Sequence, residues 1–197
     1  MRLHILPLSL VVFSSVASHA QTATKVPPAS QQIASAVLAL PPELRDSAAV
    51  LGYSTDGKFV QLREGKNEMI CLASDPALAD FHVSCYHRSM EPFMARGREL
   101  RAQGVKGPRV DTVRFAEVKS GKIKMPTQPA VLYQIFAKPG AYDPATNRVS
   151  GGTSLYVVYM PFATAASTGL SPKPQAGTPW IMFPGTPKAH IMFTPSM

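Results

Sequence analysis

Short apolar runs separated by turn-forming residues predict most of the strands of this 197-residue chain. In chain order, the expected strands cover residues 48–53, 59–63, 69–73, 81–86, 130–137 and 155–160. Asp56-Gly57 lies between the first two runs, and this dipeptide between apolar runs is a strong hairpin signal. The triplet Ile-Met-Phe occurs at 181–183 and again at 191–193, which predicts a second hairpin near the end.

Apolar residues spaced three or four apart predict helices in two parts of the chain. The first helix is expected at 31–40, with Ser30 as its N-terminal cap. A pair follows the strand at 81–86, one helix capped by Ser89 and the other at 109–120. The apolar faces of the first two helices are Ile33, Val37 and Leu40, and Phe93, Gly97 and Leu100. This order predicts an α+β fold, in which a basic helical pair is inserted between two strand groups of a largely antiparallel sheet.

The first residues have the three parts of a secretory signal peptide. Arg2 gives a positive start, an apolar stretch covers 3–16, and the small residues of Ala17-Ser18-His19-Ala20 predict cleavage after Ala20. The apolar stretch is too short and too interrupted for a membrane span, which needs about 20 apolar residues. The alternative is an uncleaved anchor.

Length and composition complete the expected domain organisation. With 45% hydrophobic and only 16% charged residues, the chain has the composition of a folded protein. We expect a signal peptide at 1–20, a flexible leader at 21–30 and a single globular domain at 31–197. No later apolar run is long enough to cross a membrane, so a periplasmic or secreted soluble protein is expected.

Two cysteines, Cys71 and Cys85, lie in the expected globular domain. An even number of cysteines in an exported chain indicates a disulfide. A metal-binding pair is disfavoured, because the CxxC spacing of zinc sites is absent. The two cysteines are therefore expected to be joined to each other, on adjacent strands or strand ends.

Positive charge is concentrated in the expected helical pair. The whole chain has a net charge of +8, and Arg88 to Lys124 alone contribute +6, from ten basic and four acidic residues. Four arginines are candidates for a ligand-binding basic face: Arg96, Arg98, Arg101 and Arg109. Such a face favours a non-catalytic binding or envelope-associated protein with an anionic partner, such as lipid head groups or acidic glycans. The alternative is a solvated face that keeps the protein soluble.

Nucleic acid is not expected as the partner, because the basic segment has few aromatic residues for stacking on bases. Phe93 and Phe115 are available there, and both are expected to be buried. The oligomeric state is left open by the sequence.

A metal-dependent enzyme or metal carrier is the second functional hypothesis. Its ligands would be His87, Glu91 and His190, since imidazole and carboxylate suit zinc or copper. The alternative is that these are unrelated polar residues, because no HxH or HExxH spacing joins them. Strand alternation places His82, Ser84 and Tyr86 on one face, and Val83, Cys85 and His87 on the disulfide side. No motif selects catalytic residues or a cofactor, and a hydrolase with a dispersed site is left open.

Several segments resemble a family of uncharacterised secreted bacterial proteins. The resemblance rests on Ala49-Val50-Leu51-Gly52-Tyr53, Met69-Ile70-Cys71-Leu72, Cys85-Tyr86-His87, the stretch 91–100, the stretch 155–161, Thr168-Gly169-Leu170 and the stretch 184–192. It covers most of the mature chain. The resemblance implies export and a single domain, and it assigns no activity and no role to any residue.

Overall fold

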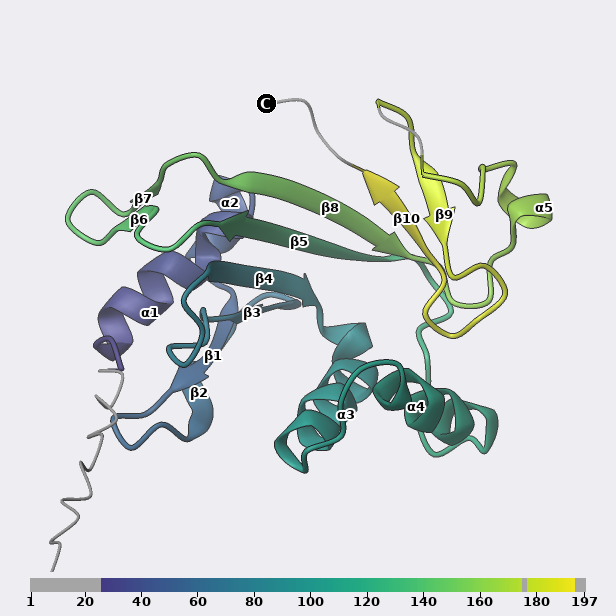
Figure 1. Ribbon diagram of the computed structural model, residues 1–197, viewed down its shortest axis with the longest axis horizontal. Coiled ribbons are helices and arrows are strands. Elements are labelled where there is room, and N and C mark those ends of the chain that lie inside the picture. Colours follow the sequence, from purple (N-terminus) through teal and green to yellow (C-terminus); the bar gives the residue numbers. More distant parts are fainter. Residues whose placement is uncertain (1–25, 175–176, 194–197) are drawn as a thin grey trace, which may run out of the picture.

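One eight-stranded sheet organises the chain in the computed structural model, which describes residues 26–174 and 177–193 (Figure 1). The strand order is β2-β1-β3-β4-β5-β8-β10-β9, and every neighbouring pair is antiparallel except β1 and β3. The strands are β1 (Ala49–Tyr53), β2 (Phe59–Arg63), β3 (Met69–Leu72), β4 (Phe81–His87), β5 (Ala130–Ala137), β8 (Thr153–Tyr159), β9 (Trp180–Met182) and β10 (His190–Phe193). A separate two-stranded sheet joins β6 (Tyr142–Asp143) to β7 (Arg148–Val149).

The helices are found where the strands connect or begin. They are α1 (Ala29–Ala36), α2 (Pro42–Arg45), α3 (Glu91–Ala102), α4 (Arg109–Lys119) and α5 (Ala165–Thr168), with 3-10 turns η1 (Val37–Ala39) and η2 (Arg88–Met90). Because α3 and α4 connect β4 to its neighbour β5, the helical pair is an insertion between two adjacent strands at one end of the sheet. The predicted α+β fold, with a largely antiparallel sheet and an inserted helical pair, is confirmed.

Both predicted hairpins are present. β1 pairs with β2 through a turn in which Gly57 has a φ of 78°, a conformation that glycine adopts without a steric penalty. β9 pairs with β10, with Ile181 opposite Ile191. The predicted signal peptide and residues 21–25 lie outside the described residues, and the end of the expected leader, from Ala29, already belongs to α1. Within the described residues, no helix is both long enough and apolar enough to cross a bilayer.

Two predicted helix caps are wrong. Ser30 lies inside α1, which begins after Pro28 without a side-chain cap. Ser89 lies inside η2, where its own N–H donates to Nδ1 of His87 over 3.3 Å. Because η2 continues directly into α3, the Glu91 N–H donates to the Arg88 carbonyl, so backbone takes the place of the expected serine cap.

One face of the sheet, here called the disulfide face, is covered by α1, η1 and α2. Cys71 and Cys85 lie directly opposite each other on β3 and β4, and their sulfur atoms are bonded at 2.05 Å. Around them pack Val50, Val83 and Leu40, all almost completely buried. The predicted disulfide is confirmed, and it lies at the centre of a closed core.

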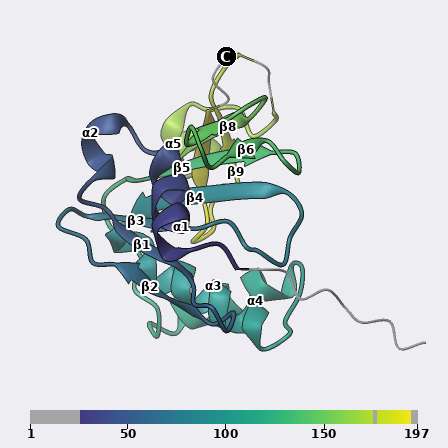
Figure 2. The same ribbon diagram turned by 90° about the vertical axis from the view of Figure 1, so that its left-hand side faces the viewer.

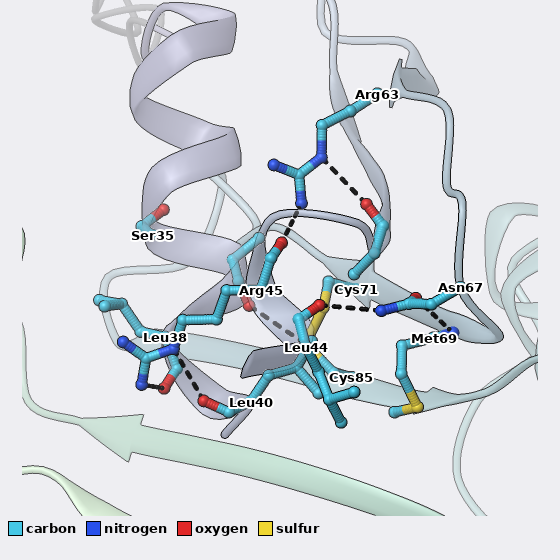
Figure 3. Close-up of a disulfide and its surroundings, with 12 residues drawn as sticks. Ser35, Leu38, Leu40, Leu44, Arg45, Arg63, Asn67, Met69, Cys71 and Cys85 are labelled. Carbon is cyan, nitrogen blue, oxygen red and sulfur yellow. Dashed lines mark hydrogen bonds between the residues drawn. A yellow bond between two sulfur atoms is a disulfide. The ribbon is translucent and has the colours of Figure 1, made fainter. Parts of the chain in front are cut away.

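Polar side chains around this core bind backbone carbonyl groups (Figure 3). Nε of Arg45 donates to the Leu40 carbonyl over 2.8 Å, and Nε of Arg63 donates to the Ala48 carbonyl over 2.9 Å. Nδ2 of Asn67 donates to the Leu44 carbonyl over 2.9 Å. The Asn67 bond ties α2 to the segment that leads into β3, the Arg45 bond braces the segment of η1 and α2 itself, and the Arg63 bond joins β2 to the start of β1, so the disulfide face is fixed by both covalent and hydrogen bonds.

The opposite face, here called the groove face, carries the other set of alternating side chains, including Leu51, Ser84 and Tyr86. Helices α3 and α4 lie together below β4, β5 and β8 in both views (Figures 1 and 2). They approach the end of β4 from which η2 begins, and Phe93 packs there against Tyr86 and other core residues. The rest of the groove face is not covered by these two helices.

The two helices also pack tightly on each other. Gly97 of α3 makes room for the buried Arg114 of α4, because a side-chain carbon at Gly97 would lie 2.9 Å from Nη1 of Arg114. The Arg114 guanidinium stacks 3.9 Å from the centre of the Phe93 ring and donates to the Phe93 carbonyl over 3.2 Å. Much of the buried surface of the pair is therefore used between the helices and not against the strands.

Candidate functional site

A groove opens on the groove face beside α3, and we call it the α3 groove. It has a volume of about 750 Å³, within the range of cavities that hold small molecules. Strands β1 to β4 form its floor, α3 forms one wall, and the loop between β3 and β4 forms its rim. The principal floor residues are Leu51, Tyr53, Phe59, Leu72, His82 and Ser84.

The β1–β2 end of the floor is largely apolar. Tyr53 and Phe59 face each other across the strand pair, with ring centres 5.3 Å apart and edge-to-face geometry. Gln32 of α1 fixes the backbone of Tyr53, since its side-chain amide both donates to the Tyr53 carbonyl and accepts from the Tyr53 N–H, each over 2.8 Å. Burial, followed by the charge of Asp75, raises the pKa of Tyr53 to about 12, so its hydroxyl keeps its proton at neutral pH.

The β4 end of the floor carries polar groups. Ser84 is buried in the floor, and the imidazole of His82 stacks on Phe136 of β5 with ring centres 4.3 Å apart. Although His82 is partly exposed, desolvation of its ring lowers its pKa, which favours the neutral form at pH 7. Leu78, Asp80 and His82 also border a second cavity of about 570 Å³, which continues over Phe136 toward β8. The α3 groove therefore has an extension across the sheet.

Arg98 stands in the α3 wall with its charge already compensated. Its guanidinium donates to Oε1 of Glu91 and to the hydroxyl of Tyr86, each over 2.7 Å. The Tyr86 hydroxyl in turn donates to Oε2 of Glu91, and burial raises the pKa of Tyr86 so that it keeps this proton. The same guanidinium lies 5.6 Å from the centre of the Phe59 ring. Arg98 is thus held in one position between helix and floor.

Arg101, one turn further along α3, is different. No carboxylate lies within ion-pair distance of Arg101 in the described part of the chain. Burial and the positive charge of Arg114 lower the pKa of Arg101, although an arginine still carries its charge at neutral pH. Asp111 is the acid whose charge acts on Arg101, and its carboxylate is held by Arg114 and by Nζ of Lys188. Arg101, an exposed residue, therefore brings a positive charge without an ion pair of its own to the wall of a cavity whose lining also includes Asp75 and Asp80.

The other two predicted arginines lie elsewhere. Arg96 makes a bidentate pair with Glu117 of α4, at 2.8 and 2.9 Å, and a further pair with Glu99. Arg109 is exposed at the first residue of α4. The structure brings Arg98 and Arg101 together on one groove wall and places Arg96 and Arg109 outside it. All four acids of the basic segment take part in ion pairs, and these pairs interrupt the expected basic face.

The predicted metal set, His87, Glu91 and His190, is not brought together. β5 and β8 separate β4 from β10, so His87 and His190 lie on strands roughly 14 Å apart at the usual strand spacing. Glu91 is bound to Arg98 and Tyr86, and Nδ1 of the buried His190 lies 2.6 Å from the Lys188 carbonyl oxygen. Among residues 26–174 and 177–193, no three histidine, cysteine, aspartate or glutamate side chains are grouped so that they could hold a metal ion.

No family model, no curated protein and no solved structure matches this chain. The site must therefore be interpreted from its own geometry. Reasoning from the sequence missed Tyr53, Asp75 and His82 as groove residues. A signal for His82 was present, because strand alternation already placed it with Ser84 on the face away from the disulfide.

Proposed function

We propose that this protein binds a small amphipathic ligand in the α3 groove, with an apolar body on the strand floor and one anionic group at Arg101. The carboxylate, sulfonate and phosphate groups share the chemistry that an arginine recognises. The observation that carries the proposal is that Arg101, which has no ion pair of its own among the described residues, lies in the wall of a cavity of about 750 Å³ whose floor is largely apolar at β1 and β2.

The two arginines of the groove wall differ in whether they have an ion-pair partner, and this difference supports a binding role. The charge of Arg98 is neutralised by Glu91, so its main contribution to the groove is its packing contact with the Phe59 ring. Arg101 has no such partner among the described residues, so a ligand anion would gain attraction there without displacing a protein carboxylate. Leu51, Leu72 and the ring of Tyr53 offer the apolar contact area that supplies most of the binding free energy of such a ligand.

Export remains part of the proposal. The Cys71–Cys85 disulfide is typical of proteins that fold outside the reducing cytoplasm. Together with the signal peptide expected at 1–20, it favours a periplasmic or secreted binding protein.

The test compares two arginine-to-glutamine variants that remove the same charge. Anilinonaphthalene sulfonate, a fluorescent dye with an aromatic body and one anionic group, is titrated into wild type, Arg101→Gln and Arg109→Gln. We expect Arg101→Gln to weaken dye binding about tenfold, the value of one charge-assisted hydrogen bond. Arg109→Gln, which changes an exposed residue outside the groove, should alter the affinity by less than about twofold.

A neutral dye separates the anion from the apolar body. Phenylnaphthylamine lacks the sulfonate, so its affinity should be the same for wild type and Arg101→Gln. Equal weakening of sulfonate binding by both variants would show a general charge effect and contradict the proposal. So would failure of wild type to bind either dye with saturation.

A further inference from the structure

Two exposed phenylalanines lie on the loops that follow β8 and β9, at the end of the sheet that bears β9 and β10 (Figure 1). Phe162 follows β8 and is 53% exposed, and Phe183 follows β9 and is 40% exposed. Their loops are hydrogen-bonded to each other, since the Phe162 N–H donates to the Thr186 carbonyl over 2.9 Å and the Gly185 N–H donates to the Ala163 carbonyl over 2.8 Å. We call Phe162 and Phe183 the aromatic tip.

Both residues of the aromatic tip have left-handed backbone conformations. The φ angles are 66° at Phe162 and 53° at Phe183. Bulky side chains rarely adopt this conformation, whereas asparagine tolerates it well, as at Asn147 in the β6–β7 turn. Strained backbone of this kind persists where surrounding contacts enforce it, and it is concentrated at functional sites. One side of the Phe183 ring packs on Nζ of Lys188, 4.6 Å from the ring centre, and on the His190 ring, while the rest of Phe183 and most of Phe162 stay exposed.

The surroundings of the aromatic tip are apolar and positively charged. Met160 and Phe162 border a shallow cavity with Ile123 and Met125, which follow α4. Lys124 lies between these two residues in the sequence and is exposed, as is Lys119 at the end of α4. Neither lysine has a carboxylate within ion-pair distance in the described residues.

Acidic side chains are nearly absent from this part of the sequence. From residue 118 to 197 there are seven lysines and arginines and a single acid, Asp143. Asp143 belongs to β6, at the opposite end of the long strands from the aromatic tip (Figure 1). The two acids of α4, Asp111 and Glu117, are both held in ion pairs. The free charges around the aromatic tip are therefore positive.

We propose that the aromatic tip docks on an anionic lipid surface, with Phe162 and Phe183 inserted at the head-group boundary and Lys119 and Lys124 against the head groups. Protruding aromatic side chains enter a fluid lipid surface without needing a complementary partner shape, and nearby lysines add attraction to anionic lipids. The tip is separate from the α3 groove, so this inference stands apart from the proposed function.

The test is co-sedimentation of the purified protein with vesicles of phosphatidylglycerol and phosphatidylcholine in equal parts, against vesicles of phosphatidylcholine alone. Wild type should bind the anionic vesicles at least about tenfold more tightly than the neutral ones, as expected for two lysines near the surface. The double variant Phe162→Asn/Phe183→Asn should bind the anionic vesicles at least about tenfold more weakly than wild type. Because asparagine suits a left-handed backbone, its thermal midpoint should not fall.

Matched controls distinguish insertion from general charge attraction. Lys119→Gln/Lys124→Gln should weaken vesicle binding severalfold, whereas Lys138→Gln/Arg148→Gln, which removes the same charge near β6 and β7, should change it by less than about twofold. Phe162→Asn alone, at the more exposed position, serves if the double variant unfolds. Vesicle binding that survives loss of the phenylalanines overturns the proposal. So does equally tight binding to soluble polyphosphate, which would show general charge attraction without a lipid surface. Absence of any binding to anionic vesicles also overturns it. Arg101→Gln should leave vesicle binding unchanged.

Discussion

The two faces of the central sheet are built from the same strands but are covered by helices to different extents. On the disulfide face, α1, η1 and α2 cover Cys71, Cys85 and Val83, and arginine and asparagine side chains bind the backbone around them. On the groove face, α3 and α4 cover one end and leave a cavity beside Ser84 and His82. The comparison teaches that one face of the sheet is closed by its covering helices, whereas the other keeps an open cavity, which the proposed function assigns to a ligand.

The cause of the difference lies in the covering helices. Val37 and Leu40 at the end of the first helical segment turn into the strands, so that face closes. In α3 and α4, Phe93 and Arg114 pack on each other, and ion pairs such as Arg96 with Glu117 join the helices side by side. A helical pair held together by its own contacts covers less of the sheet surface. The α3 groove lies on the part of the groove face that the pair leaves uncovered.

The largest expected effect is the loss of a buried leucine on the disulfide face. Leu40 is 1% exposed, so Leu40→Ala should lower the free energy of unfolding by about 3 kcal/mol. Leu72, half-buried in the groove floor, is the matched control, and Leu72→Ala should cost only about 1 kcal/mol. Urea unfolding measures both. Equal losses would mean that the two faces are packed alike.

A somewhat smaller effect is expected from removing the disulfide. The bond closes a segment with a sequence separation of 14, so Cys71→Ala/Cys85→Ala should lower the free energy of unfolding by roughly 2–3 kcal/mol through the loop it no longer closes. Because the pair lies on the face away from the α3 groove, affinity for anilinonaphthalene sulfonate should change by less than about twofold. A folded double variant that loses dye binding would contradict the independence of the two faces.

Much of this fold could be predicted from local sequence pattern. Alternation along β4 correctly separated Tyr86 from Val83 and Cys85, and Asp56-Gly57 correctly indicated the first hairpin. The parallel pairing of β1 with β3 could not be read in this way, because it depends on which side of the hairpin the third strand joins. The short strands β6 and β7 likewise lie between the predicted strands at 130–137 and 155–160, where no strand was predicted.

The candidate site was less predictable, because it depends on side-chain partners far apart in the sequence. Residue type alone grouped Arg96 with Arg98 and Arg101, but Arg96 is bound to Glu117 of the next helix. The grouping of His87 with His190 took no account of the two strands that separate them. Charge and residue type indicate which groups are available, whereas pairing in three dimensions decides which remain free.

A third effect, of medium size, sharpens the role of the groove face. Ala95 lies in the α3 wall, so Ala95→Leu adds apolar volume to the groove without changing charge or helix propensity. We expect both dyes to bind about fivefold more weakly and the free energy of unfolding to change by less than about 0.5 kcal/mol. Ala116→Leu, at an exposed position of α4, is the matched control and should bind both dyes like wild type. Tighter dye binding by Ala95→Leu would place the dye elsewhere.

The smallest effect concerns pH. His190 is 5% exposed, and burial lowers its pKa, so the folded protein keeps it neutral. The unfolded chain takes up its proton near the ordinary histidine pKa of about 6.5, so stability should fall as the pH drops below that value. His190→Asn keeps a donor for the Lys188 carbonyl and cannot titrate, and should reduce this slope in urea unfolding between about pH 7 and pH 5. His82 shifts in the same direction and accounts for part of the remaining slope.

Amide chemical-shift mapping by NMR tests the division between the two faces most directly. When anilinonaphthalene sulfonate is added to the purified protein, the largest shifts should come from Leu51, Leu72, Ser84 and Arg101 around the α3 groove. Residues at the centre of the disulfide face, such as Val50, should stay nearly unchanged. Shifts concentrated on the disulfide face, or spread evenly over the surface without saturation, would contradict the assignment of the groove as the binding site.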